Sequence, residues 1–590
     1  MRILSQPFLL LRRTVFCRIK HRLSKITVLD NAQMVDNYGT SRVKCWLQRS
    51  FQQEKSGSQF RFFPWAILLG LLVGIVSVWS SNKEALGLFH DDGIYAVVAK
   101  SLHDGTGYRV ISLPTAPDQT KYPFLYSYIL SWLWSLDPKF PDNIGLLKAA
   151  NAAFLTAIFI LSYLFYRRRV PGEESEGLLF AALVCVNPTV FSFTDFTVSD
   201  ILFLLLSLSA LVIFDASEQC TSRRSVTLLA VIVALCCLTR SAAVPLAVAG
   251  AVHFTWSRRY RDLTHYLCLV VLFITPWWLW VRTHSHQTAS SLLDYYVSYS
   301  SEPPAFAIMW FDPFGAVEIV WGNLRYIVEA LDVTFQSRII PGLLLPVGLV
   351  LLLGVWRSFN DQSVFFRSYV LLYLALVVAW PFHPARYLIP LVPGIYFFLF
   401  RGVQAAEVHL NNLMTSEARK KILCHLARVT FALVVVLHVG WISNYLLRKD
   451  GATTRAWFGK RLPAGWQGFS ETFEWIRNNT DESTILATVY DPMYYLYTGR
   501  RSIQPGLHKP ATYFYPYGRA VPDVGSPDEI KAELKFLGVG FLVIHPLKDY
   551  GKHDAYSKLW AELINSYRNP PELMFTSSDS KHRIYALPQD

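Results

Sequence analysis

A succession of apolar runs constrains this chain more than any other feature of its sequence. Between residues 63 and 447, about eleven such runs alternate with short polar connections. A helix needs roughly 20 apolar residues to cross the hydrocarbon core of a bilayer. The chain is 52% hydrophobic and only 17% charged, whereas soluble proteins carry about 25% charged residues. We therefore predict a polytopic α-helical membrane protein with about eleven or more spans.

The basic residues give these spans a direction, because Lys and Arg concentrate on the cytoplasmic side of a membrane. The first 61 residues carry twelve Lys and Arg against three acids, and Arg167-Arg168-Arg169 closes the second run. The formal net charge of +13 therefore indicates membrane topology and does not indicate nucleic-acid binding. The distribution of Lys and Arg along the chain predicts a cytoplasmic N-terminus and an external segment at residues 81–144. The predicted spans are Phe63–Ser80, Gly145–Tyr166, Leu178–Phe193, Ile201–Phe214, Val226–Leu238, Ala242–Phe254, Tyr266–Val281, Ile339–Trp356, Tyr369–Trp380, Leu388–Phe400 and Val429–Leu447.

Composition divides the chain into three regions. Residues 1–60 are predicted to form a basic cytoplasmic extension, and a start at Met34 instead of Met1 is an open alternative. Residues 61–447 form the membrane domain. From residue 448 to residue 590 the charge content becomes ordinary, which predicts an extracytoplasmic α/β domain. Its predicted elements are helices at Ser470–Asn478 and Pro527–Phe536 and strands at Thr484–Val489 and Phe541–His545.

An acidic pair, Asp91-Asp92, follows the first predicted span and lies in the predicted external segment. A solvated surface turn is the simplest interpretation of such a pair. The alternative is a general base that takes a proton from an attacking hydroxyl or amine. Together with His90, the pair has ligand types suited to a divalent ion. A metal held by Asp91 and Asp92 is therefore a second possibility, and the sequence establishes no cofactor.

Three cations are predicted on the same external side, where Lys and Arg are depleted. Arg240 and Arg386 each lie at the outer end of a span, and Lys121 precedes an aromatic interfacial segment. An arginine near membrane depth is expensive unless it is paired. One interpretation is a site for a phosphate headgroup. The other is a structural pairing of the arginines with Asp195 or Asp200, and the two are compatible.

Sequence motifs of other enzyme classes are absent. The chain contains no Walker motif, no GxGxxG before a helix, no HExxH and no GxSxG. ATP-driven transport, dinucleotide chemistry, zinc proteolysis and serine hydrolysis are therefore disfavoured.

Several short motifs, in this order and with this sidedness, resemble the GT-C membrane glycosyltransferases. The resemblance covers roughly residues 60–450 and is strongest to the branch that holds the protein O-mannosyltransferases, the aminoarabinose lipid A transferases and the Rgt-type transferases. The tail also resembles the external domains of Rgt-type members. The motifs are Asp91-Asp92, Lys121-Tyr122-Pro123, Leu238-Thr239-Arg240, Pro276-Trp277-Trp278 and Ala385-Arg386-Tyr387.

This resemblance implies a polyprenyl-phosphate sugar as donor and a lipid, glycan or protein as acceptor. It implies that Asp91 or Asp92 is the catalytic acidic residue, which activates the acceptor, and that Lys121 and Arg386, with Arg240, bind the donor phosphate. Many members of the family have Asp-Glu where this chain has Asp-Asp. Some members have Glu-Lys-Pro-Pro where this chain has Thr120-Lys121-Tyr122-Pro123, and the missing Glu is one acid fewer for a metal, which leaves the role of a metal open. The residues expected to support the site are His90, Tyr95, Tyr126, Asp195, Asp200, His383 and Tyr387.

Two other functions remain compatible with the sequence. A lipid-linked oligosaccharide polymerase or ligase has many spans and external arginines, but we would expect a larger central external loop. A transporter or flippase would show internal repeats and mid-bilayer charges, and neither is evident here. The tail lacks cysteine, which together with the Rgt-like tail favours a bacterial inner membrane.

Overall fold

The computed structural model describes most of the chain after residue 61. The described residues are 62–218, 222–285, 293, 296–297, 305–310, 312–380, 382–413, 417–447, 466–505, 526–545 and 553–588. Internal contacts divide the chain into Met1–Phe63 and Pro64–Asp590, and all described helices and strands after Ser80 belong to the second unit. The predicted cytoplasmic extension, residues 1–60, lies outside the described residues.

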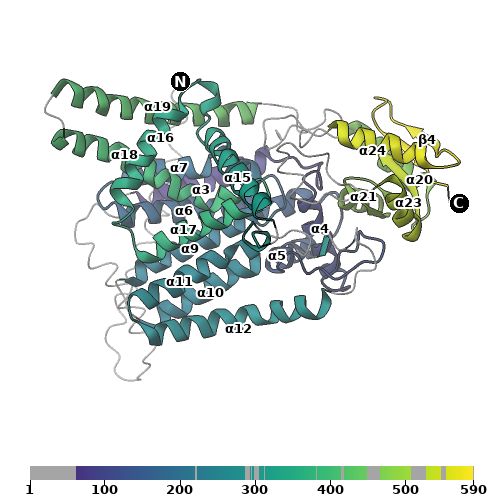
Figure 1. Ribbon diagram of the computed structural model, residues 1–590, viewed down its shortest axis with the longest axis horizontal. Coiled ribbons are helices and arrows are strands. Elements are labelled where there is room, and N and C mark those ends of the chain that lie inside the picture. The colour runs from purple at the N-terminus through teal and green to yellow at the C-terminus, as the bar shows by residue number, and fades with distance from the viewer. Residues whose placement is uncertain are drawn as a thin grey trace, which may run out of the picture. The chain divides into compact units, whose positions relative to one another are not determined.

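Every apolar run predicted to span the membrane contains helix, and α9, α10, α11 and α12 run side by side (Figure 1). Among the described residues, five helices are long and apolar enough to cross a membrane, and three shorter apolar helices accompany them. The number of spans therefore stays a prediction. The membrane-region helices are α3 (Phe63–Ser80), α6 (Ile144–Arg169), α7 (Glu174–Cys185), α8 (Pro188–Phe193), α9 (Asp200–Glu218), α10 (Arg223–Thr239), η1 (Ser241–Ala243), α11 (Val244–Trp256), α12 (Tyr260–His284), α14 (Ala305–Ile308), α15 (Pro313–Thr334), η2 (Ser337–Ile339), α16 (Leu344–Ser358), α17 (Val364–Ala379), η3 (Arg386–Leu391), α18 (Val392–Leu413) and α19 (Glu417–Leu447).

The helices differ from the sequence prediction at two places. The run Leu178–Phe193 is broken between α7 and α8, because Asn187 caps a new helix that has Pro188 in its first turn. The Asn187 side chain accepts hydrogen bonds from two backbone amides of α8, the usual function of an N-cap asparagine. The helix α15 forms between the predicted spans Tyr266–Val281 and Ile339–Trp356, where no helix was predicted.

Close packing of α16 against α18 fixes the helix that continues from Arg386. A Cβ atom added to Gly354 would lie 1.8 Å from the carbonyl oxygen of Phe398, and one added to Gly402 would lie 1.9 Å from that of Val350. Small residues allow membrane helices to approach this closely. The helix α18, which continues from Arg386, is therefore packed closely against α16.

The predicted external segment, residues 81–144, contains two helices. They are α4 (Asp91–His103) and α5 (Leu125–Leu136). In α4 the apolar residues are fully buried from Ile94 to Ala99, so this helix is enclosed by protein. Its first residue, Asp91, is one of the predicted site residues.

The C-terminal region forms a small α/β domain, which agrees with the predicted class, and its sheet has the order β2-β1-β3-β5-β4. Strands β2, β1 and β3 are parallel, and β5 and β4 join antiparallel. The sequence did not predict β2, β4 or β5. The elements are α20 (Trp466–Asn479), β1 (Ile485–Ala487), α21 (Asp491–Thr498), β2 (Arg501–Ile503), α23 (Pro527–Phe536), β3 (Val539–Ile544), α24 (His553–Ser566), β4 (Glu572–Thr576) and β5 (Arg583–Ala586).

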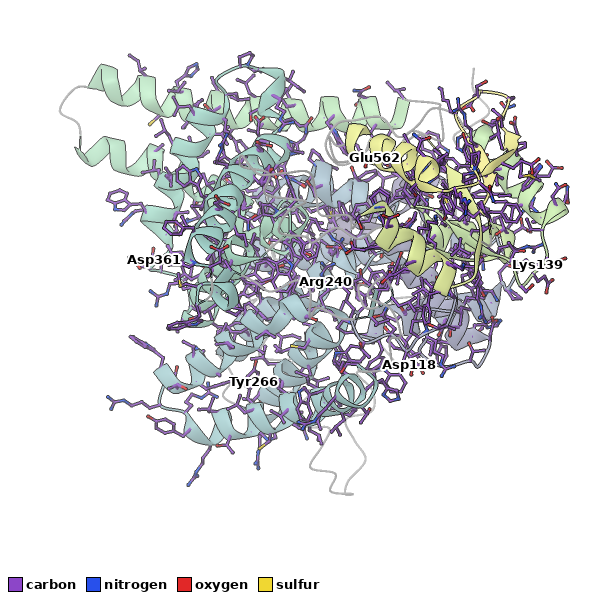
Figure 2. The ribbon with its side chains drawn as sticks, turned by 45° about the vertical axis from the view of Figure 1, so that its right-hand side comes forward. Asp118, Lys139, Arg240, Tyr266, Asp361 and Glu562 are labelled. Atoms are coloured by element: carbon purple, nitrogen blue, oxygen red, sulfur yellow. The ribbon has the colours of Figure 1, made fainter. Side chains whose placement is uncertain are left out.

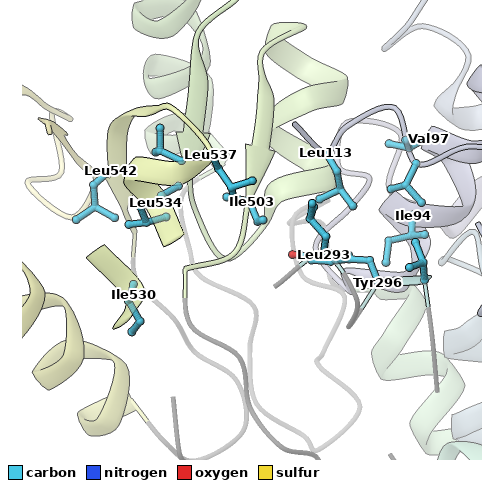
Figure 3. Close-up of a cluster of buried hydrophobic side chains, with 14 of the residues drawn as sticks. Ile94, Val97, Leu113, Leu293, Tyr296, Ile503, Ile530, Leu534, Leu537 and Leu542 are labelled. Atoms are coloured by element: carbon cyan, nitrogen blue, oxygen red, sulfur yellow. The ribbon is translucent and has the colours of Figure 1, made fainter. Parts of the chain in front are cut away.

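One hydrophobic core joins the first external segment to the C-terminal domain. In this cluster, Ile94 and Leu113 belong to the external segment, while Ile503 and Leu542 belong to the sheet. Figure 3 shows Leu113 and Ile503 facing each other, with Tyr296 beside Ile94. Since burial of such side chains contributes about 1.5–3 kcal/mol each, the two parts stabilise each other.

Candidate functional site

Asp91 and Arg386, which are 295 positions apart in the sequence, form an ion pair between α4 and η3. Arg386 Nη1 lies 2.5 Å from Asp91 Oδ2. The other carboxylate oxygen, Oδ1, accepts a hydrogen bond from the Tyr122 hydroxyl at 2.9 Å. The predicted catalytic carboxylate, Asp91, and one residue predicted to bind the donor phosphate, Arg386, are thus brought together.

Asp200, the first residue of α9, connects this pair to the second arginine. Its two carboxylate oxygens accept hydrogen bonds from Nε and Nη2 of Arg386, at 3.2 Å and 3.1 Å. Arg240 Nη1 lies 2.7 Å from Asp200 Oδ2. The result is a chain of alternating charges, Asp91–Arg386–Asp200–Arg240, called the Asp–Arg cluster below. The structural pairing foreseen for Asp200 is therefore present.

Aromatic and hydroxyl side chains enclose the Asp–Arg cluster. The guanidinium carbon of Arg386 lies 5.2 Å from the ring centre of Phe89, and that of Arg240 lies 5.5 Å from the ring centre of Tyr387. Ser199 accepts a hydrogen bond from Arg240 Nη1 at 3.3 Å. Figure 2 shows Arg240 amid the helices. Such surroundings strengthen electrostatic interactions because they limit contact with water, although the Arg386 and Asp91 side chains stay 13% and 21% exposed.

Two predicted tyrosines lie beside this group. The hydroxyl of Tyr95 is 2.8 Å from that of Ser199. Tyr126 packs edge-on against Tyr95 with ring centres 5.2 Å apart, and its hydroxyl donates to Asn151. Tyr95 thus contacts the cluster through Ser199, and Tyr126 supports Tyr95.

Asp92 has a different environment from that of Asp91. Its Oδ2 accepts a hydrogen bond from the backbone amide of Gly87 at 2.9 Å, and its Oδ1 accepts from Phe89 and Gly93 at 3.1 Å and 3.0 Å. The side chain is buried, and burial raises its pKa although the Gly87 amide opposes the shift. Asp92 therefore organises the turn before α4, while Asp91 faces the arginines.

Asp91 and Asp92 are not arranged to bind a metal ion together. Asp91 is engaged by Arg386 and Tyr122, and Asp92 is engaged by three backbone amides. A divalent ion prefers several convergent carboxylate or imidazole ligands. Within the described part of the chain, no group of three or more His, Cys, Asp or Glu is placed to hold one.

Electrostatics favour the ionised form of Asp91. Burial alone raises its pKa, but Arg386 opposes this through charge and hydrogen bonding, with His90 and Tyr122 contributing in the same direction. The net effect is a pKa below the ordinary value. A carboxylate in this state is ready to accept a proton once a substrate hydroxyl or amine comes within reach.

His90 lies at a sharp turn immediately before Asp91. Its φ of 65° and ψ of −62°, with the Asp91 amide donating to the Phe89 carbonyl at 2.8 Å, define a γ-turn of the rare, strained kind. The His90 Nε2 atom lies 3.0 Å from Oδ1 of Asp491, the first residue of α21. The C-terminal domain therefore contacts the site through this histidine.

Three other predicted site residues have different surroundings. Lys121 is buried, and its backbone amide donates to the Gln119 side chain. A contact between its ammonium group and the donor stays a prediction. Asp195 is paired with Lys148, whose Nζ lies 3.0 Å from Oδ1. His383 packs on the Tyr326 ring, with centres 4.4 Å apart.

Sequence reasoning missed four residues that the structure places at or near the site. Tyr122 donates to Asp91, Ser199 bridges Tyr95 and Arg240, Lys148 pairs with Asp195, and Asp491 pairs with His90. Tyr122 directly follows Lys121, and Ser199 directly precedes Asp200, so proximity was a usable signal for those two. The pairing of Asp491 with His90 spans 401 positions and has no local signature.

Solved membrane glycosyltransferases have the same fold. ArnT from Cupriavidus metallidurans, in a crystal structure with bound undecaprenyl phosphate, matches with a TM-score of 0.50 at 14% identity, covering 89% of this chain and 98% of ArnT. Its apo structure matches with a TM-score of 0.51 at 12% identity, covering 90% and 99%. This chain has the GT-C glycosyltransferase fold.

A second GT-C structure extends the likeness. The Archaeoglobus fulgidus oligosaccharyltransferase, tethered to an acceptor peptide, matches with a TM-score of 0.50 at 11% identity, covering 90% of this chain and 75% of that enzyme. No protein-family model matches the sequence, and no curated protein matches it at a significant level. The GT-C resemblance predicted from short motifs is therefore confirmed by fold.

Proposed function

We propose that this protein is an integral-membrane glycosyltransferase that moves a sugar from a polyprenyl-phosphate donor to a lipid, glycan or protein acceptor. The observation that carries the proposal is the Asp91–Arg386 ion pair, placed on a fold shared with an ArnT that binds undecaprenyl phosphate. A carboxylate base for the acceptor and a cation for the leaving phosphate are the two groups that such a transfer requires.

The donor phosphate binds by replacing Asp91 at Arg386. Arg386 uses Nε and Nη2 to hold Asp200, so only its Nη1 contact with Asp91 needs to change. A phosphate oxygen suits this position, because arginine forms strong charge-assisted hydrogen bonds with phosphate. Binding then frees Asp91 beside the sugar. Arg240, and in our proposal Lys121, add positive charge nearby.

The chemical step is a displacement at the anomeric carbon. The acceptor oxygen or nitrogen attacks that carbon while Asp91 takes its proton, and the bond from the anomeric carbon to the phosphate oxygen breaks. The bonding electrons leave with the polyprenyl phosphate, and the configuration inverts. Arg386 and Arg240 stabilise the charge that develops on the departing phosphate. The step needs no nucleotide.

We further propose that the N-terminus is cytoplasmic and that the C-terminal domain and the Asp–Arg cluster are extracytoplasmic, in a bacterial inner membrane. The basic residues 167–169 at the end of α6 support this direction, since they lie at the end remote from the first external segment and basic residues concentrate on the cytoplasmic side. Residues 448–590 then extend the site on the outer face, where the acceptor would be selected.

The test is sugar transfer by the purified protein in detergent or nanodiscs. Radiolabelled polyprenyl-phosphate sugars are supplied with a membrane extract, and product mass identifies the sugar and the acceptor. Wild type is compared with Asp91→Asn and Arg386→Ala, and with Asp142→Asn, an exposed aspartate of the same external segment. We expect loss of transfer in the first two variants only. Full activity of Asp91→Asn contradicts the mechanism, and lipid movement without cleavage of the donor indicates a transporter.

A further inference from the structure

We propose that Asp491 of the C-terminal domain is a positioning residue for Asp91, acting through His90. The inference rests on the proposed function, because it assigns a task to a residue outside the reacting groups. It also gives the C-terminal domain a part in the chemical step itself. Four observations support it.

The first observation is the strained backbone at His90. A positive φ with a negative ψ is rare for a residue with a side chain, and strained residues at a functional site persist only where the surroundings hold them. Asp91 is the next residue, so the turn at His90 sets the direction in which the Asp91 carboxylate leaves α4. A relaxed turn would move that carboxylate relative to Arg386.

The second observation is the contact that holds His90. Oδ1 of Asp491 lies 3.0 Å from His90 Nε2 and accepts a hydrogen bond from the Tyr296 hydroxyl at 2.9 Å. The His90 and Tyr296 rings also pack, with centres 5.7 Å apart. Asp491 is fully buried. Burying an ionised carboxylate costs folding free energy unless it is paired. The contact with His90 therefore stabilises the Asp491 carboxylate in this position.

The third observation is the rigid setting of Asp491. The Ser502 hydroxyl donates to the Asp491 carbonyl at 2.6 Å, and the Ser502 amide donates to the Ser112 carbonyl of the external segment at 2.8 Å. Arg501 Nη1 donates to the Pro114 carbonyl at 2.7 Å. The start of α21 is therefore tied to strand β2, and strand β2 is tied to the external segment.

The fourth observation is the close fit of α21 against the turn. A Cβ atom added to Gly93 would lie 2.7 Å from Cβ of Pro492, and one added to Gly87 would lie 2.6 Å from Cβ of Met493. Only glycine allows so close an approach at these two positions. Because α21 abuts the turn on both sides of His90, a shift of this helix is transmitted directly to the turn.

The contact test is a double-mutant cycle on sugar transfer. Asp491→Ala and His90→Ala should each lower kcat about 10- to 100-fold, the usual cost of misplacing a reacting group, with little change in the donor KM. The double variant should be no slower than the slower single variant, because both changes remove one contact. Asp491→Asn, which keeps a hydrogen-bond acceptor, should recover part of the rate. The matched control is Asp481→Asn, an exposed aspartate of the same domain.

His90→Gly separates backbone from side chain. Glycine adopts the positive φ without strain, which offsets part of the cost of leaving the buried Asp491 without its partner, so the variant should melt no lower than His90→Ala and yet transfer slowly. Multiplicative losses in the cycle, a raised KM with normal kcat, or full activity of His90→Gly would each overturn the inference.

Hydrogen exchange tests the same link without any sugar transfer. In full-length Asp491→Asn and Asp491→Ala, the amides of Asp91 and its neighbours in the turn should exchange faster than in wild type, while those of α10 stay unchanged. Unchanged exchange in the turn overturns the inference. If the wild-type protein transfers no sugar from any donor, the proposed function fails, and the exchange measurement still decides whether Asp491 holds the turn.

Discussion

Asp200 holds Arg386 through both carboxylate oxygens, with Nε–Oδ1 and Nη2–Oδ2 distances of 3.2 Å and 3.1 Å. This two-point contact fixes the plane of the guanidinium and leaves Nη1 directed at Asp91. The arginine is thereby oriented before any donor arrives. Groups that need no reorganisation stabilise developing charge most effectively.

Asp200→Asn should lower sugar transfer by about 10²- to 10³-fold, the range found when one electrostatic contact to a transition state is lost. Both Arg386 and Arg240 lose their shared counter-charge, and a buried cation without its partner costs about 3–5 kcal/mol. The melting temperature should fall as well. Transfer kinetics and thermal unfolding of the same preparation measure both effects.

The control for Asp200→Asn is Asp262→Asn, since Asp262 also pairs with an arginine, Arg259, but is partly exposed. Exposed pairs contribute about 0–1 kcal/mol, so this variant should resemble wild type. A normal transfer rate in Asp200→Asn would show that the orientation of Arg386 does not depend on Asp200.

Arg386→Lys should be nearly as damaging as Arg386→Ala, although it retains the positive charge. Lysine is a point charge and cannot hold both oxygens of Asp200 while it reaches a third acceptor. We expect a higher donor KM and a loss of kcat of about 10²-fold. Titration of the protein with polyprenyl phosphate, followed by native mass spectrometry, gives the binding part separately. Equal binding and rate in Arg386→Lys would reduce Arg386 to a simple counter-charge.

Tyr122→Phe should shift the pH dependence of the reaction. Burial raises the pKa of Asp91, and Arg386 lowers it most, but the Tyr122 hydroxyl also contributes to its low value. Removing that hydroxyl raises the pKa of Asp91, so the base is protonated at higher pH. The acidic limb of the kcat/KM profile should therefore move to higher pH.

Tyr128→Phe provides the comparison for Tyr122→Phe, because Tyr128 is an exposed tyrosine of the same external segment. Its profile should superimpose on that of wild type. An unmoved acidic limb in Tyr122→Phe would mean that Asp91 is not the base whose ionisation the profile reports.

Local patterns predicted the helices well and the site in part. Apolar runs located the helices, and the motif around Asp91 and the outer arginines Arg240 and Arg386 identified three members of the Asp–Arg cluster. The pattern did not separate Asp91 from Asp92, since the two residues are adjacent and chemically equal. Only the turn before α4 distinguishes them, because it directs Asp92 to backbone amides and Asp91 to Arg386.

Long-range partners were the part that the sequence did not reveal. Asp195 and Asp200 are equally plausible partners for an arginine at a span end, yet Asp195 pairs with Lys148 and Asp200 with the arginines. The choice depends on how α6 and α9 pack. Likewise, the strands β2, β4 and β5 are three to five residues long and contain charged residues, so they lack the continuous apolar run that identifies a short buried strand.

The His90–Asp491 pair should make stability depend on pH. Burial alone lowers the pKa of His90, but Asp491 opposes burial through charge and hydrogen bonding, Asp91 and Asp92 add to its effect, and together they raise the pKa. Protonated His90 therefore favours the folded state. The stabilisation is complete below the ordinary histidine pKa of about 6.5 and is lost as the pH rises through the raised value.

Melting temperatures of wild type and His90→Gln, measured from about pH 6 upward, test this dependence. The advantage of wild type should be greatest at the acidic end and should shrink as the pH rises. His103→Gln, a change at a histidine on the exposed end of α4, should show no such trend. An advantage that grows with pH would contradict the assigned direction.

The Lys148–Asp195 pair offers a test of the scaffold that leaves the reacting groups untouched. Both side chains are 3% exposed, and Asp195 Oδ1 also accepts the Asn82 amide at 2.9 Å. Lys148→Met leaves a buried carboxylate without its cation and should cost about 3–5 kcal/mol. Adding Asp195→Asn removes the stranded charge and keeps an acceptor for Asn82, so the double variant should recover most of the stability. Chemical unfolding of the two variants, beside Lys100→Met at the exposed pair with Asp104, measures this recovery. A double variant less stable than Lys148→Met would mean that Asp195 is needed for more than its pair with Lys148.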